Sequence, residues 1–283
     1  MKNKDVIQTI ISHHYNVWVG REIQPSTTRD QILWGDGEEE CTGIVTTIYA
    51  SMEVIRKAAQ VGANLIICHE SLFWNHGDHI DWLEGFDTFR QKSQLLTDNH
   101  ITVWRDHDYI HAGMDWQGRR VDGIFFGLLK ELGWEGYVQG DVSFPLLIEI
   151  PELKTGKLAA LLMQRLHLNG IKCIGDTDGC SQHIYIPNHM TGKDNDKIEK
   201  METEDIDTIL GMECIDYTVG IYTRDAAMLG KNRRILVIGH FNLEEPGMKW
   251  FGETWLPTIL PKELPIRFIS AGDMFRYFTA PSR

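Results

Sequence analysis

Short β-rich runs alternate with helical runs along most of the chain, and this alternation is typical of α/β proteins. The strands predicted in the first half cover residues 43–50, 64–69 and 101–106. The helices predicted between them cover residues 51–63 and 86–99. Ser51 is a good N-cap for the first of these helices, and Gly62 lies near its end. The pattern therefore predicts βαβ units.

The strongest helical periodicity in the chain begins at residue 121. Six apolar residues repeat there at helical spacing: Val121, Ile124, Phe125, Leu128, Leu129 and Leu132. Such a continuous apolar stripe predicts a helix whose apolar face is buried.

The second half returns to the same alternation. Strands are predicted at residues 144–150, 171–176, 182–187, 233–240 and 265–272, with 214–221 as a further element. Helices are predicted at residues 155–170, at 224–229 and from about Gly247. The polar run 191–205 predicts a solvated loop or the start of an exposed helix. We therefore expect an N-terminal α/β lobe over residues 1–140 and a C-terminal α/β lobe over 141–283.

Charge and composition narrow the classes of partner. The chain has 28 Lys and Arg against 40 Asp and Glu, a net charge of −12, which argues against a nucleic-acid backbone as a partner. Its apolar stretches are far shorter than the roughly 20 residues of a membrane span. The N-terminus does not resemble a secretory signal, and the five cysteines include no CxxC pair. We expect a cytoplasmic protein with reduced thiols.

Histidines are concentrated in one region. Six of the twelve lie between residues 69 and 111. His69, His107 and His240 each follow a predicted strand. Because ligands of open α/β sheets bind just beyond the carboxyl ends of the strands, we expect these three side chains to converge.

Each of these histidines has a carboxylate or a second imidazole close by in sequence. The groups are His69 with Glu70, His107 with Asp108 and His111, and His240 with Glu244. A spacing of four residues places two side chains on one face of a helical turn. Imidazole mixed with carboxylate suits zinc, manganese or iron better than calcium or magnesium. The alternative is that these are ordinary polar loop residues.

Three segments carry a family resemblance. Residues 62–74, 101–113 and 239–250 resemble, in order and spacing, the signature blocks of the Nif-three-like family of dinuclear-metal hexamers, whose members often carry the name GTP cyclohydrolase I type 2. The resemblance covers most of the chain, although residues 138–215 match loosely. It implies two α/β lobes with mixed sheets, a metal site in the cleft between them and a homohexamer.

The resemblance also implies a ligand set for two divalent ions (zinc, manganese or iron). Carried over position by position, that set is His69, Glu70, His111, His240 and Glu244. Glu70 stands where the family has a second histidine, and His111 stands where the family has an aspartate. The exchange preserves three histidines and two carboxylates. By resemblance Glu244 bridges the ions, His69 and His240 hold one, and Glu70 and His111 hold the other.

These features predict a metal-dependent hydrolase of a small molecule, such as a nucleotide or another heterocycle, because paired ions activate water. His107 and Asp108 are the candidate catalytic residues, and His107 is also a candidate extra ligand. The alternatives are a non-catalytic metal-binding regulatory or scaffold protein and a metal-storage protein. The chain contains no GxSxG elbow, P-loop or GxGxxG fingerprint, so no residue in it specifies GTP.

Overall fold

The computed structural model describes residues 1–278 and divides the chain into two compact units. Unit 1 comprises Met1–Gly127 and Glu245–Ala271, and unit 2 comprises Leu128–Glu244 with the described residues from Gly272 onward. These units differ from the predicted lobes 1–140 and 141–283, because the chain returns to unit 1 after Glu244. None of the helices in the described part is long and apolar enough to cross a membrane.

Unit 1 is built on a five-stranded mixed sheet. Its strand order is β14 (Ile266–Phe268), β4 (Ile44–Thr47), β5 (Leu65–Cys68), β6 (Thr102–Arg105) and β3 (Ile32–Trp34). The first four strands are parallel, and β3 is antiparallel at the edge. Thr47 pairs with Cys68, and Cys68 pairs with Arg105, so these three strands end at one level. The predicted α/β class is confirmed.

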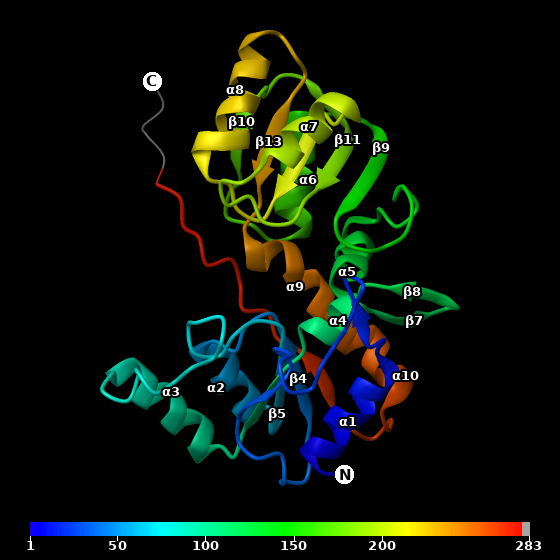
Figure 1. Cartoon of the computed structure of the whole chain (residues 1–283). Helices are drawn as coiled ribbons and strands as arrows, with labels where there is room; N and C mark the ends of the chain where they lie inside the picture. The colour runs from blue at the N-terminus through cyan, green and yellow to red at the C-terminus, as the bar shows by residue number, and fades with distance from the viewer. Residues whose placement is uncertain (279–283) are drawn as a thin grey trace. The chain divides into compact units, whose positions relative to one another are not determined.

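Helices cover both faces of this sheet. Figure 1 shows α2 (Met52–Gln60) and α3 (Asp87–Asp98) on one side, and α1 (Asn3–His13) and α10 (Leu256–Ile259) on the other. The Ser51 side chain accepts a hydrogen bond from the Val54 backbone at 3.2 Å, which confirms the predicted N-cap. Val54 and Leu96 pack with Ile66 and Val103 in one apolar cluster, so burial of apolar surface holds this layer together.

Two helices complete unit 1, and each of them also has residues in unit 2. The helix predicted from residue 121 is confirmed as α5 (Gly123–Leu132), with its apolar residues buried. The helix predicted to start near Gly247 instead begins at His240 and runs through Pro246 as α9 (His240–Trp250). A Cβ added to Gly247 would lie 2.4 Å from Ile124 Cα, so glycine is required where α5 and α9 cross.

Short elements surround this framework. They are the hairpin β1 (Val17–Trp18) and β2 (Arg21–Glu22), the helix α4 (Asp108–Ala112), the hairpin β7 (Met114–Trp116) and β8 (Arg119–Val121), and the π-helical turn η2 (Phe251–Trp255). The first hairpin and α4 contact each other, and both contribute to the site described below.

Unit 2 has its own five-stranded mixed sheet. The order is β10 (Lys172–Gly175), β13 (Arg234–Val237), β12 (Thr208–Gly211), β11 (Cys180–Ile186) and β9 (Leu146–Lys154). Strands β11, β12 and β13 are parallel, and the two edge strands are antiparallel to their neighbours. The sequence did not predict β12, and residues 214–221 contain the π-helical turn η1 (Asp216–Gly220).

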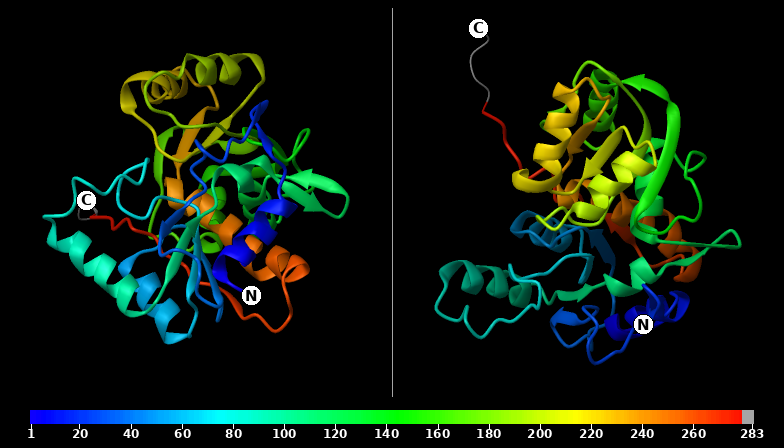
Figure 2. Two further views of the ribbon diagram at one scale, coloured as in Figure 1. Left: turned by 60° about the horizontal axis from the view of Figure 1, so that its bottom comes forward. Right: turned by 45° about the horizontal axis from the view of Figure 1, so that its top comes forward.

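Three helices accompany this sheet. Figure 2 shows α7 (Asn195–Thr203) and α8 (Ile221–Met228) in front of it in the right-hand view. Met201 of α7 joins Ile209 and Ile235 in the apolar core. The polar run 191–205 therefore contains a helix with one buried side. The third helix, α6 (Thr155–Arg165), packs on β9 and β11 and ends five residues before the predicted Gly170.

Candidate metal centre

The carboxyl ends of β5 and β6 carry three histidines of unit 1. His69 directly follows β5, and His107 follows β6 by two residues. The chain then turns into α4, whose last turn contains His111, and the His111 N–H donates to the His107 carbonyl at 3.2 Å. Because β5 and β6 are parallel neighbours, all three imidazoles lie at one edge of the sheet.

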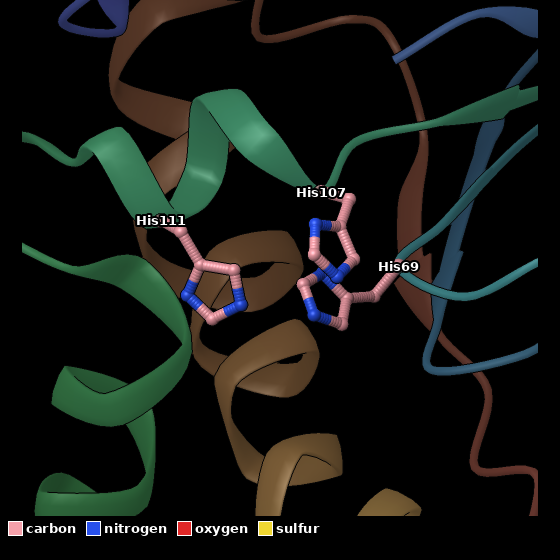
Figure 3. Close-up of side chains that lie close together, drawn as sticks. All are labelled: His69, His107 and His111. Atoms are coloured by element: carbon pink, nitrogen blue, oxygen red, sulfur yellow. The ribbon is translucent and has the colours of Figure 1, made fainter. Parts of the chain in front are cut away.

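The three imidazole rings contact one another, and Figure 3 shows them gathered between α4 and the strand ends. The rings of His69 and His107 are stacked with centroids 4.5 Å apart. His111 meets them edge-on, with centroids 4.9 Å from His69 and 5.1 Å from His107. One nitrogen of each ring lies within 4.8 Å of the others, which is close enough for one ion to bind all three.

Each imidazole is oriented by an acceptor on its Nδ1 atom. The acceptors are the Asp106 carbonyl for His69 at 3.0 Å, the Asp108 carboxylate for His107 at 3.0 Å, and the Asp122 carboxylate for His111 at 2.9 Å. Carbonyl and carboxylate oxygens only accept, so Nδ1 carries the proton in each ring, and the lone pair of the neutral ring lies on Nε2. Metal-binding histidines in proteins are usually held in this way.

Burial keeps two of these imidazoles neutral. His69 is fully buried, and burial holds its pKa well below the ordinary value. Burial lowers the pKa of His107 to about 3, although the hydrogen bond to Asp108 acts in the opposite direction. Neutral imidazole is the form that binds a metal ion. The rings of His69 and His107 are therefore in the ligand form at neutral pH.

Asp108 connects this group to the loop before β3. Its carboxylate accepts from the Thr28 hydroxyl at 2.9 Å, from the Arg29 backbone at 3.1 Å and from the Arg29 guanidinium at 2.9 Å. Burial opposes its ionisation, but the hydrogen bonds from His107 and Arg29 prevail and lower the pKa of Asp108. Asp108 is therefore an anion that positions His107.

Asp30 is a site residue that the sequence analysis missed. Its carboxylate accepts from the backbone N–H groups of His107, of Asp108 at 3.0 Å and of Tyr109 at 2.8 Å, so it caps the N-terminus of α4 from a distant loop. Burial, followed by the charge of Asp106, raises the pKa of Asp30 to about 7. No local sequence signal links Asp30 to a helix that begins 78 residues later.

Glu70 lies beside the group but is held by a buried arginine. Arg105 Nη2 is 3.5 Å from Glu70 Oε2, and Arg105 Nη1 is 3.2 Å from Asp78 Oδ2. Arg105 Nε also donates to the His69 carbonyl at 3.2 Å. The loop containing Asp78 is therefore fixed by the same arginine that supports the end of β5.

A cavity of about 350 Å³ lies next to the histidines within unit 1. Trp18, Arg21, Thr28 and Asp108 contribute to its lining. The Trp18 ring stacks on His111 with centroids 5.3 Å apart and an angle of 9° between the planes. No feature of the sequence marked Trp18 as a neighbour of the histidines.

The other two predicted ligands belong to unit 2. His240 is the first residue of α9, and its Nε2 is 3.2 Å from Glu244 Oε2 one turn later. The predicted spacing therefore places both side chains on one face of a helix. His240 also lies near His189 and Glu213. The five-residue ligand set and its location in a cleft remain predictions from the sequence.

The fold is similar to that of several solved structures. The Bacillus cereus protein related to NIF3 has a TM-score of 0.69 at 14% identity, with 98% of this chain and 99% of that chain covered. A hypothetical protein of Staphylococcus aureus has a TM-score of 0.68 at 16% identity, with the same coverage of 98% and 99%. At these identities the likeness concerns the fold alone.

Sequence comparison identifies the family. The GTP cyclohydrolase 1 type 2 homolog of Clostridium perfringens is 25% identical over 221 residues, which cover 76% of this chain and 78% of that protein. The family model Duf34/NIF3 (NGG1p interacting factor 3) matches residues 31–270. This match spans most of the chain and both units. The predicted resemblance is confirmed, and the chain belongs to the Duf34/NIF3 family.

Proposed function

We propose that this protein is a metal-dependent hydrolase of a small molecule and that His69, His107 and His111 hold a divalent ion. The observation that carries the proposal is the anchoring of all three imidazoles through Nδ1. Three imidazoles form a donor set that fits zinc, manganese or iron. A bound ion supplies Lewis acidity for hydrolysis.

Two aspartates orient the imidazoles that would bind the ion. Asp108 keeps the His107 proton on Nδ1, and Asp122 does the same for His111. Asp108 also lines the 350 Å³ cavity, so one carboxylate contacts both the histidine group and the space open to a small ligand. Trp18 also lines that space. These features favour a planar heterocycle, such as a nucleobase, as substrate.

Metal dependence and turnover are tested together. Protein stripped of metal is reconstituted with zinc, manganese or iron and incubated with nucleotides and other nitrogen heterocycles, and the products are identified by mass spectrometry. We expect turnover only in reconstituted protein and at least a hundredfold loss in His107→Ala. His100→Ala is the matched control, because His100 is an exposed histidine that pairs with Glu39 at 3.6 Å. Bound metal without turnover of any compound would support the regulatory or scaffold alternative.

The finer proposal is a dinuclear centre that includes Glu70, His240 and Glu244. If Glu244 bridges two ions, Glu244→Ala lowers the metal content by both ions, measured by inductively coupled plasma mass spectrometry. Asp108→Ala should retain at least one ion, because Asp108 orients a ligand and is not one of the five. Unchanged metal content in Glu244→Ala would remove Glu244 from the ligand set. Light scattering tests the expected homohexamer in the same samples.

A further inference from the structure

A second group of metal-binding side chains lies in unit 2. His189 follows β11, Glu213 follows β12, and His240 follows β13. These three strands are parallel and adjacent, so their carboxyl ends bring the three residues to one edge of the sheet. The arrangement repeats the strand-end placement of the histidines in unit 1, with different residues and a different sheet.

The side chains of this group face one another closely. Glu213 Oε1 is 2.5 Å from His189 Nδ1, and Glu213 Oε2 is 3.8 Å from His240 Nδ1. The two imidazole rings have centroids 5.0 Å apart. One donor atom of each residue lies within 4.8 Å of the others. Both oxygens of one carboxylate are therefore directed at an imidazole.

His240 is the residue that this group shares with the ligand set predicted from the family resemblance. Its Nδ1 is the nitrogen nearer Glu213, and its Nε2 is 3.2 Å from Glu244 Oε2. The Nδ1 side of the ring is therefore the side that faces this group.

We propose that His189, Glu213 and His240 form a mononuclear, zinc-type metal site in unit 2. Two imidazoles and one carboxylate are a common zinc donor set that leaves the fourth position open. Donor atoms of a tetrahedral zinc site with bonds of about 2.1 Å lie roughly 3.4 Å apart. The Glu213–His189 distance of 2.5 Å is shorter than this value, and the Glu213–His240 distance of 3.8 Å is longer. The ion takes the place of the proton shared by His189 and Glu213, and that proton is released to solvent.

The exposure of the group makes this an exchangeable site. The side chains of His189, Glu213 and His240 are 54%, 34% and 31% exposed. Small rotations of His189 meet little packing resistance at this exposure. His189 and Glu213 lie outside the ligand set predicted from the family resemblance, whereas His240 belongs to it, so the variants that test this group change only His189 and Glu213.

Zinc stoichiometry and affinity test the proposal. The full-length protein is stripped of metal and titrated with zinc against a chromophoric chelator, and cobalt absorption is recorded as a second readout. We expect the wild type to bind one equivalent more than His189→Ala and Glu213→Gln. His183→Ala is the matched control in the same unit, because His183 is a 35%-exposed histidine with Glu149 at 3.9 Å and Asp205 at 3.7 Å.

Retention of the extra equivalent in His183→Ala, with its loss in both other variants, supports the site. Equal stoichiometry and affinity in the wild type, His189→Ala and Glu213→Gln would overturn it, and so would the absence of the extra equivalent from the wild type. Thermal unfolding verifies that the exposed substitutions leave the fold intact. If only the hydrolase proposal fails, His189→Ala and Glu213→Gln still lose this zinc equivalent, but the wild type turns over no substrate.

Discussion

The two histidine groups share a position in their sheets but differ in burial and support. In unit 1, His69, His107 and His111 are at most 9% exposed, and each has its own acceptor on Nδ1. In unit 2, His189 and His240 share the single carboxylate of Glu213, and all three side chains are at least 31% exposed. The same strand-end geometry therefore carries one rigid group and one open group.

This difference has a physical consequence for metal binding. A ligand that is already oriented by packing and a hydrogen bond loses little conformational freedom when it binds an ion. An exposed side chain must be ordered at that moment, and this costs affinity. We expect tight, slowly exchanging metal in unit 1 and weaker, exchangeable metal in unit 2. The next three predictions test this contrast.

The largest expected effect concerns the buried arginines. Arg105 in unit 1 and Arg234 in unit 2 are both at most 1% exposed, and each lies near two aspartate or glutamate side chains. Replacing either with methionine leaves one buried carboxylate, Glu70 or Asp207, without its cation, so each variant should lose about 3–5 kcal/mol of unfolding free energy. Chemical denaturation measures this loss.

Metal binding should separate the two arginine variants. Arg105 supports the His69 carbonyl, so Arg105→Met should also weaken the tight metal equivalent, whereas Arg234→Met should retain it. Equal losses of metal affinity in Arg105→Met and Arg234→Met would contradict the proposed link between Arg105 and the histidines of unit 1. Arg105→Lys, which keeps the charge, serves as a milder variant if the methionine variant unfolds.

A smaller effect is expected for Asp122→Asn. Asp122 Oδ2 accepts from His111, while Oδ1 accepts from the backbone N–H groups of Ile124 and Phe125 at 2.9 and 3.1 Å. Asparagine can keep the helix cap with its Oδ1, but the Nδ2 group then placed at His111 is a donor and cannot accept the His111 proton. Metal affinity should fall about 10- to 100-fold, with little change in melting temperature. Unchanged affinity in a titration against a chelator would show that orientation of His111 is unimportant.

The smallest expected effect is a difference between the two groups in the rate of zinc release. When zinc-loaded protein is mixed with excess chelator, the equivalent that depends on His189 should leave first, with an affinity at least about tenfold weaker than that of the equivalent that depends on His111. Stopped-flow absorbance of the chelator complex resolves the two phases. A single phase, or release in the opposite order, would contradict the contrast between the rigid and open groups.

Much of the fold could be predicted from the sequence because many helices and strands are marked by short-range sequence signals. The apolar stripe from Val121 to Leu132 and the Ser51 cap are periodic or short-range signals, and both predictions are confirmed. Strand β12 was missed because it has only four residues, Thr208–Gly211, next to a polar run. The start of α9 was misplaced because Pro246, usually a residue of the first helical turn, lies inside the helix.

The candidate site was predictable only in part. His69, His107 and His111 were found because strand ends and a four-residue spacing mark them in the sequence. Their partners were not found, since Asp30 and Trp18 come from distant loops and hairpins whose approach depends on tertiary packing. The pairing of Glu70 with Arg105 joins residues 35 positions apart, and no local rule predicts it.

Anomalous diffraction from zinc-soaked crystals tests the central claim most directly. Data collected on both sides of the zinc absorption edge locate the ion without any assumption about its ligands. The account predicts an anomalous peak about 2.1 Å from the Nε2 atoms of His69, His107 and His111. Zinc bound elsewhere in well-occupied sites, with no peak among these three imidazoles, would contradict it.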